Sequence, residues 1–267
     1  MPLLHLFLVA VIQGITEFLP ISSSGHLILL PQLTGLDDQG LTIDVAVHVG
    51  TLAAVILYFW ADVRVAVHGA GRLLRGKIDT SSAFLALCLV VATVPVVIAG
   101  LALKLSGFDE NLRSVAVIGW TMLLFGVLLY WVDTRAPQSR TAPEWTLKHA
   151  LIMGLWQVVA LIPGTSRAGI TITGGRALGY DRHDAAKLSM LMAIPTIAAS
   201  GLVVGADVAA EANWALARDA AIGAVFAFAS ALAALAVMMP LARRISFTPY
   251  VVYRVVLGLI LLWVAYA

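Results

Sequence analysis

The chain has 267 residues, of which 61% are hydrophobic and only 12% are charged, and its formal net charge is +2. Soluble domains carry about 25% charged residues, so this composition excludes a soluble globular protein and is typical of a polytopic membrane protein. The small net charge and the lack of a Lys/Arg block argue against nucleic acid as a partner. A single cysteine, Cys88, excludes an internal disulfide and a cysteine-based metal site.

The apolar segments come in two lengths. A membrane span needs about 20 apolar residues. Six segments approach that length: 42–60, 83–103, 113–132, 183–205, 218–238 and 249–266. Two others, Leu3–Ile15 and Leu151–Ile162, hold about 12 or 13 residues before a polar stretch with a proline, and a second short apolar run follows each. These paired short runs predict re-entrant hairpins over 3–36 and 149–178, in which a helix breaks and a second helix follows.

The order of these elements repeats along the chain. A hairpin and three spans fill residues 1–132, and the same order fills 149–267 after a linker at 133–148. Because three spans are an odd number and a hairpin returns to its own side, the second repeat is expected to insert upside down. The predicted fold is an all-α polytopic membrane protein of two inverted-topology repeats, joined into one membrane domain.

Basic residues in the loops predict the orientation. Arginines and lysines concentrate in the loops at 61–82, 133–148 and 239–248. The positive-inside rule places these three loops in the cytoplasm and both chain termini outside. A plain topology of eight spans stays open as the alternative.

The first hairpin contains the segment QGITEFLPISSSGHL, residues 13–27. Its candidate functional residues are Gln13, Glu17, Ser22, Ser23, Ser24 and His26. An ionisable group such as Glu17 is expensive at membrane depth and marks a functional site by default. Serines are favoured helix caps, so capping and a structural ion pair are the alternative interpretation, but three serines followed by a histidine exceed what capping needs.

The second hairpin contains the segment IPGTSRAGITITGG, which begins at Ile162. Small and hydroxyl residues surround one arginine there: Gly164, Thr165, Ser166, Arg167 and Thr171. Hydroxyls, free backbone N–H groups and a helix N-terminus form an anion site, and the planar fork of Arg167 suits two phosphate oxygens. The pattern favours binding of phosphate or diphosphate, although Arg167 could instead only neutralise Glu17.

Both segments resemble the signature regions of the bacterial undecaprenyl-diphosphate phosphatases, the membrane enzymes linked to bacitracin resistance. Gln13 and Glu17 match the element Glu/Gln-x-x-x-Glu, and the run from Pro163 matches Pro-Gly-x-Ser-Arg-Ser-x-x-Thr. The C-terminal RRISFTPYVVYRVVLG is also similar to this family. Gln13 stands where many members have Glu, so a metal site of two carboxylates is not assumed, and Ala168 replaces the second serine of the motif.

The resemblance implies hydrolysis of undecaprenyl diphosphate to the monophosphate and inorganic phosphate, which recycles the lipid carrier for peptidoglycan synthesis and confers resistance to bacitracin. Catalytic roles are expected for Glu17, Ser23, His26 and Arg167, and substrate binding for Gln13, Ser22, Ser24, Gly164, Thr165, Ser166 and Thr171. A divalent cation, Mg2+ or Ca2+, is expected with Glu17 as a ligand. The nucleophile is left open between His26, Ser23 and water.

The expected partners are a polyprenyl diphosphate and membrane lipid, in the bacterial plasma membrane, with the site open to the periplasm or cell exterior. Whether the chain forms a homo-oligomer is left open. A lipid-phosphate or anion transporter is the alternative function, because inverted repeats and broken helices are typical of secondary transporters. A nucleophile and a base close together, Ser23 or His26 beside Glu17, favour the enzyme. A purely structural membrane subunit is a third hypothesis, which the two polar breaks argue against.

Overall fold

The computed structural model describes residues 1–35, 39–107, 112, 114–209 and 214–267. Residue 36, where the first hairpin is predicted to end, and residue 113, where a span is predicted to begin, lie outside the described residues. The described part of the chain is helical and contains no strand. The prediction of an all-α fold is therefore confirmed.

Six of the helices are long and apolar enough to cross a membrane. They are α3 (Gly40–Tyr58), α5 (Ser81–Ser106), α6 (Val115–Arg135), α9 (Arg182–Ala209, apolar enough over Arg182–Leu202), α10 (Trp214–Ala242) and α11 (Thr248–Tyr266). Each overlaps one of the six segments expected from hydropathy. The remaining described helices are α1 (Leu3–Phe18), α2 (Ser23–Thr34), α4 (Trp60–Leu73), α7 (Leu147–Val158) and α8 (Arg167–Ala177), with short 3-10 turns η2 (Ala142–Glu144) and η3 (Val159–Leu161).

Both short helix pairs break at a proline. A residue that precedes proline is pushed out of the helical region by the proline ring. Leu19, before Pro20, has an extended backbone with φ −72° and ψ 145° and ends α1. Ile162, before Pro163, is also extended, with φ −81° and ψ 119°, and ends η3. The same local steric rule therefore produces both breaks.

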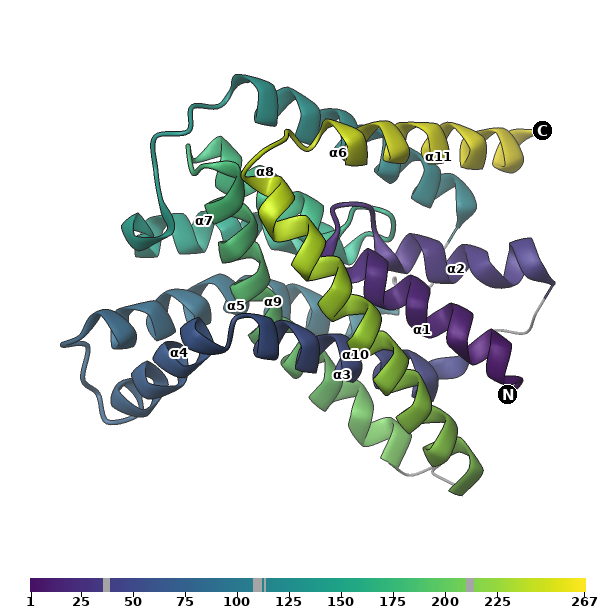
Figure 1. Ribbon diagram of the computed structural model, residues 1–267, viewed down its shortest axis with the longest axis horizontal. Helices are drawn as coiled ribbons and strands as arrows, with labels where there is room; N and C mark the ends of the chain where they lie inside the picture. The colour runs from purple at the N-terminus through teal and green to yellow at the C-terminus, as the bar shows by residue number, and fades with distance from the viewer. Residues whose placement is uncertain (36–38, 108–111, 113, 210–213) are drawn as a thin grey trace.

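The short helices pack closely against long ones. Gly14 brings α1 so near α10 that a Cβ there would lie 2.6 Å from the carbonyl oxygen of Ala227. Gly154 brings α7 equally near α5, where a Cβ would lie 2.5 Å from the oxygen of Ala92. Figure 1 shows α6 and α11 running side by side and α10 crossing α3. The two breaks lie between these groups of helices, in the interior of the molecule.

The prediction of a loop over 61–82 is wrong for its first half, because Trp60–Leu73 form α4. This helix contains two glycines and three valines, which have low helix propensity and weaken a helix signal in the sequence. Its contact with α5 stabilises it instead: Gly69 is buried, and a Cβ there would lie 1.9 Å from the carbonyl oxygen of Ser82. The loops after α4 and after α6 lie at the left of Figure 1 and the two termini at the right, so two of the basic loops share the end opposite the termini.

Candidate functional site

Glu17 is the centre of a hydrogen-bonded cluster built from both breaks. Its Oε1 accepts a hydrogen bond from Nη2 of Arg167 at 2.7 Å. Its Oε2 accepts from Oγ of Ser23 at 2.7 Å and from Nε2 of Gln13 at 3.0 Å. Glu17 and Gln13 are on α1, Ser23 begins α2 and Arg167 begins α8. The fold thus joins two polar segments that lie 150 residues apart in the chain.

Local backbone geometry aims α2 and α8 at this cluster. Ser22 has φ 74° and its Oγ accepts from the N–H of Gly25, while Ser166 has φ 70° and its Oγ accepts from the N–H of Gly169. Within the described residues these two serines are the only non-glycine residues with positive φ. Such a conformation costs about 1–3 kcal/mol and is typical of functional sites. As N-caps, they make Ser23 and Arg167 the first helical residues, facing Glu17.

Three of the expected site residues, one catalytic and two substrate-binding, keep a buried polar atom that has no hydrogen-bond partner. These atoms are Nη1 of Arg167, Oε1 of Gln13 and Oγ1 of Thr165. An unsatisfied buried polar group costs about 1–3 kcal/mol, and a charged one costs more. Donors and an acceptor left open in this way are suited to a polar ligand, and the guanidinium nitrogen is suited to an anion.

The other expected hydroxyls have partners of their own. Ser22 and Ser166 cap their helices. For Ser22, capping is the alternative interpretation that the sequence left open. Ser24 is exposed and its Oγ lies 3.4 Å from that of Ser22. Thr171 is fully buried, and its Oγ1 donates to the carbonyl oxygen of Arg167 and lies 2.6 Å from Oγ of Ser189 on α9. The Thr171 hydroxyl therefore faces α9 and is not bonded to the Glu17 cluster.

His26 lies one turn after Ser23 on α2 but is bonded elsewhere. Its Nδ1 is 2.6 Å from the backbone oxygen of Ser22, and its Nε2 is 2.6 Å from the hydroxyl of Tyr253 on α11. Gly164 has φ +84°, and a Cβ there would lie 2.2 Å from Oγ1 of Thr121. The second break therefore requires glycine at this position, for both its backbone angle and its close approach to α6.

Comparison with known proteins places the chain in a family. Residues 6–260 match the family described as "Bacitracin resistance protein BacA". The chain belongs to the BacA family. It is 71% identical to a protein of Dinoroseobacter shibae and 64% identical to one of Ruegeria pomeroyi, over the full length of both chains in each case. It is 45% identical to a protein of Saccharophagus degradans over 97% of this chain and 96% of that protein. All three relatives are named "Undecaprenyl-diphosphatase".

The structure adds His48 to the BacA site, although the sequence suggests a structural histidine. His48 is on α3, and its Nε2 lies 3.9 Å from Oε2 of Glu17. Its Nδ1 is 2.7 Å from the backbone oxygen of Asp44, one turn earlier. A signal existed in the sequence, since Asp44 and His48 are polar residues one turn apart within an apolar span.

Arg254 is a second residue near the breaks for which the sequence predicts no role. It is on α11, its side chain is fully buried, and its guanidinium donates to the carbonyl oxygens of Pro20, Gly164 and Thr165. It also donates to carbonyl oxygens of α6. One cation therefore ties both breaks of the BacA fold together. The rule that singled out Glu17, an ionisable group inside an apolar segment, applies equally to Arg254.

Glu17 and Gln13 offer oxygen atoms of the kind that a hard divalent cation binds. Such ions prefer oxygen ligands; the Glu17 carboxylate is one, and the fully buried Oε1 of Gln13, whose Nε2 donates to Glu17, is a second that has no hydrogen-bond partner. Gln13 thus offers an oxygen where many BacA relatives are expected to offer a carboxylate. Arg167 already neutralises Glu17, so the protein part of this site carries no excess negative charge.

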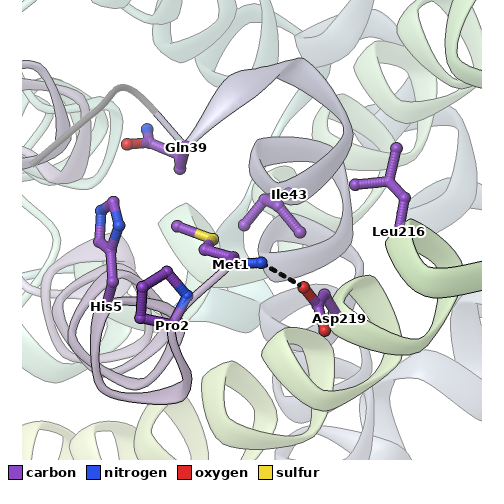
Figure 2. Close-up of a pocket in the computed structure, with 7 residues that line it drawn as sticks. All are labelled: Met1, Pro2, His5, Gln39, Ile43, Leu216 and Asp219. Carbon is purple, nitrogen blue, oxygen red and sulfur yellow. Dashed lines mark hydrogen bonds and ion pairs between the residues drawn. The ribbon is translucent and has the colours of Figure 1, made fainter.

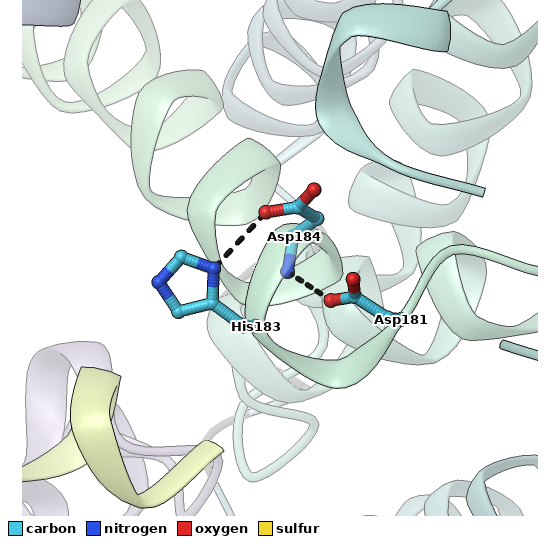
Figure 3. A group of neighbouring side chains, drawn as sticks. All are labelled: Asp181, His183 and Asp184. Atoms are coloured by element: carbon cyan, nitrogen blue, oxygen red, sulfur yellow. Dashed lines mark hydrogen bonds and ion pairs between the residues drawn. The ribbon is translucent and has the colours of Figure 1, made fainter. Parts of the chain in front are cut away.

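One further cluster of polar residues in this BacA protein has a structural explanation. Asp181, His183 and Asp184 bring potential metal ligands within 4.8 Å of one another. Figure 3 shows, however, that Asp181 accepts from the N–H of Asp184, and that Asp184 also bonds His183. Asp184 further accepts from the N–H of Ala142. These carboxylates therefore fix the start of α9 and the linker before it.

A cavity of about 240 Å³ opens near the start of α1, between α3 and α10. Figure 2 shows its lining residues: Met1, Pro2, His5, Gln39, Ile43, Leu216 and Asp219. The terminal ammonium of Met1 pairs with Asp219 at 3.0 Å inside it. None of the expected site residues lines this cavity, so it is separate from the Glu17 cluster.

Proposed function

We propose that this chain is an integral membrane phosphatase that hydrolyses undecaprenyl diphosphate to undecaprenyl phosphate and inorganic phosphate. Relatives that match it over their full length carry the name "Undecaprenyl-diphosphatase", and the family is described by resistance to bacitracin. The reaction returns the lipid carrier to peptidoglycan synthesis. The substrate is a polyprenyl diphosphate taken from the membrane in which the six apolar helices sit.

The observation that carries this function is the free nitrogen of Arg167 beside a nucleophile and a base. Nη2 of Arg167 is bonded to Glu17, whereas Nη1 is buried and has no partner. A planar guanidinium offers its donors as a fork, so Nη1 is left to bind a phosphate oxygen next to Ser23. The first N–H groups of α2 and α8 add donors and positive helix-dipole ends.

Ser23 is the proposed nucleophile and Glu17 its base, because Oγ of Ser23 already donates to Glu17 at 2.7 Å. Oγ attacks the terminal phosphorus, its proton passes to Glu17, and the bond from phosphorus to the bridging oxygen breaks, which releases undecaprenyl phosphate. Water then adds to the phosphoserine, Glu17 returns its proton to the departing Oγ, and inorganic phosphate leaves with both water hydrogens. Arg167 stabilises the negative charge on the phosphoryl oxygens.

His26 is the alternative nucleophile. Neutral imidazole needs no base, but both ring nitrogens of His26 are engaged, one by Ser22 and one by Tyr253. Attack by Nε2 would first require the Tyr253 hydroxyl to move away. This geometry favours the serine route.

A divalent cation is part of the proposal. Glu17 and Oε1 of Gln13 would hold it, and the cation would neutralise charge on the diphosphate when bound. Mg2+ suits these oxygen ligands and commonly keeps phosphate oxygens and waters in its shell. Without the cation, Arg167 would be the main positive charge at the diphosphate.

The proposed topology is two inverted repeats with re-entrant hairpins, open to the periplasm or cell exterior. Four features support it. The order of a short helix pair followed by three spans occurs twice. Ser22 and Ser166 share one cap geometry, and α1 on α10 corresponds to α7 on α5. The positive-inside rule places the basic loops in the cytoplasm and the two chain termini outside.

Phosphate release from a prenyl diphosphate by the purified protein in detergent, with Mg2+ and with a chelator, tests the function. Arg167→Ala and Glu17→Gln are expected to lower kcat by about 100-fold or more, the usual effect of removing a group that stabilises transition-state charge. Arg167→Lys keeps the charge that balances Glu17 but loses the fork, so it separates lost chemistry from lost folding. Arg72→Ala, which alters an exposed arginine paired with Asp79, is the matched control.

Normal turnover in Arg167→Ala would remove the phosphate-binding role of Arg167. A folded wild-type protein that binds the lipid but releases no phosphate would contradict the phosphatase and favour the lipid-phosphate carrier. Turnover that is indifferent to the chelator would contradict the cation site at Glu17 and Gln13.

A further inference from the structure

His26 is held by one group on each ring nitrogen. Nδ1 lies 2.6 Å from the backbone oxygen of Ser22, and Nε2 lies 2.6 Å from the hydroxyl of Tyr253. The two rings also stack, with centroids 5.7 Å apart and planes inclined by 8°. Tyr253 is 227 residues away in the chain, on α11. The contact therefore connects α11 to the first turn of α2.

These contacts select one tautomer of His26. A carbonyl oxygen can only accept a hydrogen bond, so Nδ1 must carry the hydrogen that bonds Ser22. In a neutral imidazole Nε2 is then an acceptor, and the Tyr253 hydroxyl donates to it. The Ser22 carbonyl oxygen thus fixes the tautomer, and the Tyr253 hydroxyl, bonded to Nε2, fixes the plane of the ring.

Tyr253 contributes little to the interior packing. Its side chain is 43% exposed, and two nearby residues of α11, Val252 and Val256, are 56% and 52% exposed. On such an apolar surface a tyrosine hydroxyl needs a polar partner, and His26 supplies it. Loss of the hydroxyl therefore removes this hydrogen bond and leaves the core of the protein intact.

We propose that Tyr253 is a positioning residue for the phosphatase reaction. Its hydroxyl holds His26, and His26 in turn holds the backbone of Ser22, the residue directly before the nucleophile Ser23. Because Ser23 must stay aligned with Glu17 and the phosphorus, a small shift of the first turn of α2 slows the attack. This inference rests on the proposed function and on Ser23 as nucleophile, and Tyr253 itself does not touch the substrate.

The kinetic test compares Tyr253→Phe with Tyr250→Phe. Tyr250 is one turn earlier on α11, beside Phe247 and outside the site, so it is a matched control. Tyr253→Phe is expected to lower kcat about tenfold with KM within about twofold, because orientation of the nucleophile is lost while the phosphate contacts stay. Tyr250→Phe is expected to keep both values. Wild-type kcat in Tyr253→Phe, or a loss confined to KM, would overturn the proposal.

A second measurement does not depend on activity. In protein labelled with 15N-histidine, the His26 signals are identified by their absence from His26→Gln, and they report which ring nitrogen carries the hydrogen. The wild type is expected to show the Nδ1–H form with a hydrogen-bonded Nε2, and Tyr253→Phe the same tautomer with the Nε2 signal shifted by loss of that hydrogen bond. An Nε2–H form in the wild type, or unchanged signals in Tyr253→Phe, would refute the positioning role. If the wild type releases no phosphate, the proposed function fails, while these spectra still decide whether Tyr253 orients His26.

Discussion

Arg254→Met should destabilise the protein strongly, because Arg254 joins the two breaks from inside the fold. Its guanidinium donates hydrogen bonds to the carbonyl oxygens of Pro20, Gly164 and Thr165 at 3.3, 3.1 and 2.9 Å. These oxygens belong to loop breaks and so have no helical partner of their own. Methionine fills a similar volume but donates no hydrogen bond.

The size of the effect follows from these three carbonyl groups. Each buried acceptor left without a donor costs about 1–3 kcal/mol, which gives a gross cost of about 3–9 kcal/mol. Removing a buried cation also removes its desolvation penalty, which offsets part of this cost. We therefore expect the free energy of unfolding to fall by about 3 kcal/mol, near the lower end of the range. For a chain of this size such a loss lowers Tm by about 6–12 °C.

Thermal unfolding of the purified variants in detergent, followed by circular dichroism, measures this loss. Arg254→Lys keeps a charge but has one nitrogen for several acceptors, so an intermediate Tm is expected. Arg72→Met, at an exposed ion pair with Asp79, is expected to leave Tm unchanged. A wild-type Tm together with wild-type phosphate release in Arg254→Met would refute the reasoning that this arginine holds the breaks together.

Two further predictions concern the backbone of the second break, at Gly164, and the buried ion pair between Asp133 and Arg176. Gly164→Ala should abolish phosphate release, because Gly164 has φ +84° and an added Cβ would lie 2.2 Å from Oγ1 of Thr121. Gly179 has a similar φ of +88°, but no atom lies nearer than 3.5 Å to an added Cβ, so Gly179→Ala should lower stability and leave phosphate release intact. Asp133→Ala should cost about 3–5 kcal/mol in unfolding free energy, since it removes the carboxylate that a fully buried Arg176 contacts at 2.9 Å, whereas Asp133→Asn keeps an acceptor and should cost less. Active Gly164→Ala, or equal Tm values for both Asp133 variants, would contradict these assignments.

The candidate site was only partly predictable from the sequence. Glu17 and Arg167 stand out because ionisable groups are rare in apolar segments, and the structure bonds them to each other. Their catalytic roles stay predictions. Thr171 lies on the expected helix, but whether its hydroxyl faces the site or α9 depends on how α8 is rotated against its neighbour, and it bonds Ser189.

Local physics determined a large part of this protein. Hydropathy over about 20 residues locates the six spans, and the clash of a proline ring with the preceding residue sets both breaks, at Leu19 and Ile162. These rules act over a few neighbouring residues, so the sequence alone is enough to apply them. The family motifs in both breaks are equally local.

Only the tertiary structure decided which groups meet across the chain. Arg254 reaches a carbonyl group 234 residues away, and Tyr253 reaches His26 across 227 residues. His48 approaches Glu17 from another helix, and α4 forms where α5 offers it a close packing surface. Such contacts depend on how whole helices pack and rotate against one another, which hydropathy and single-residue preferences do not specify.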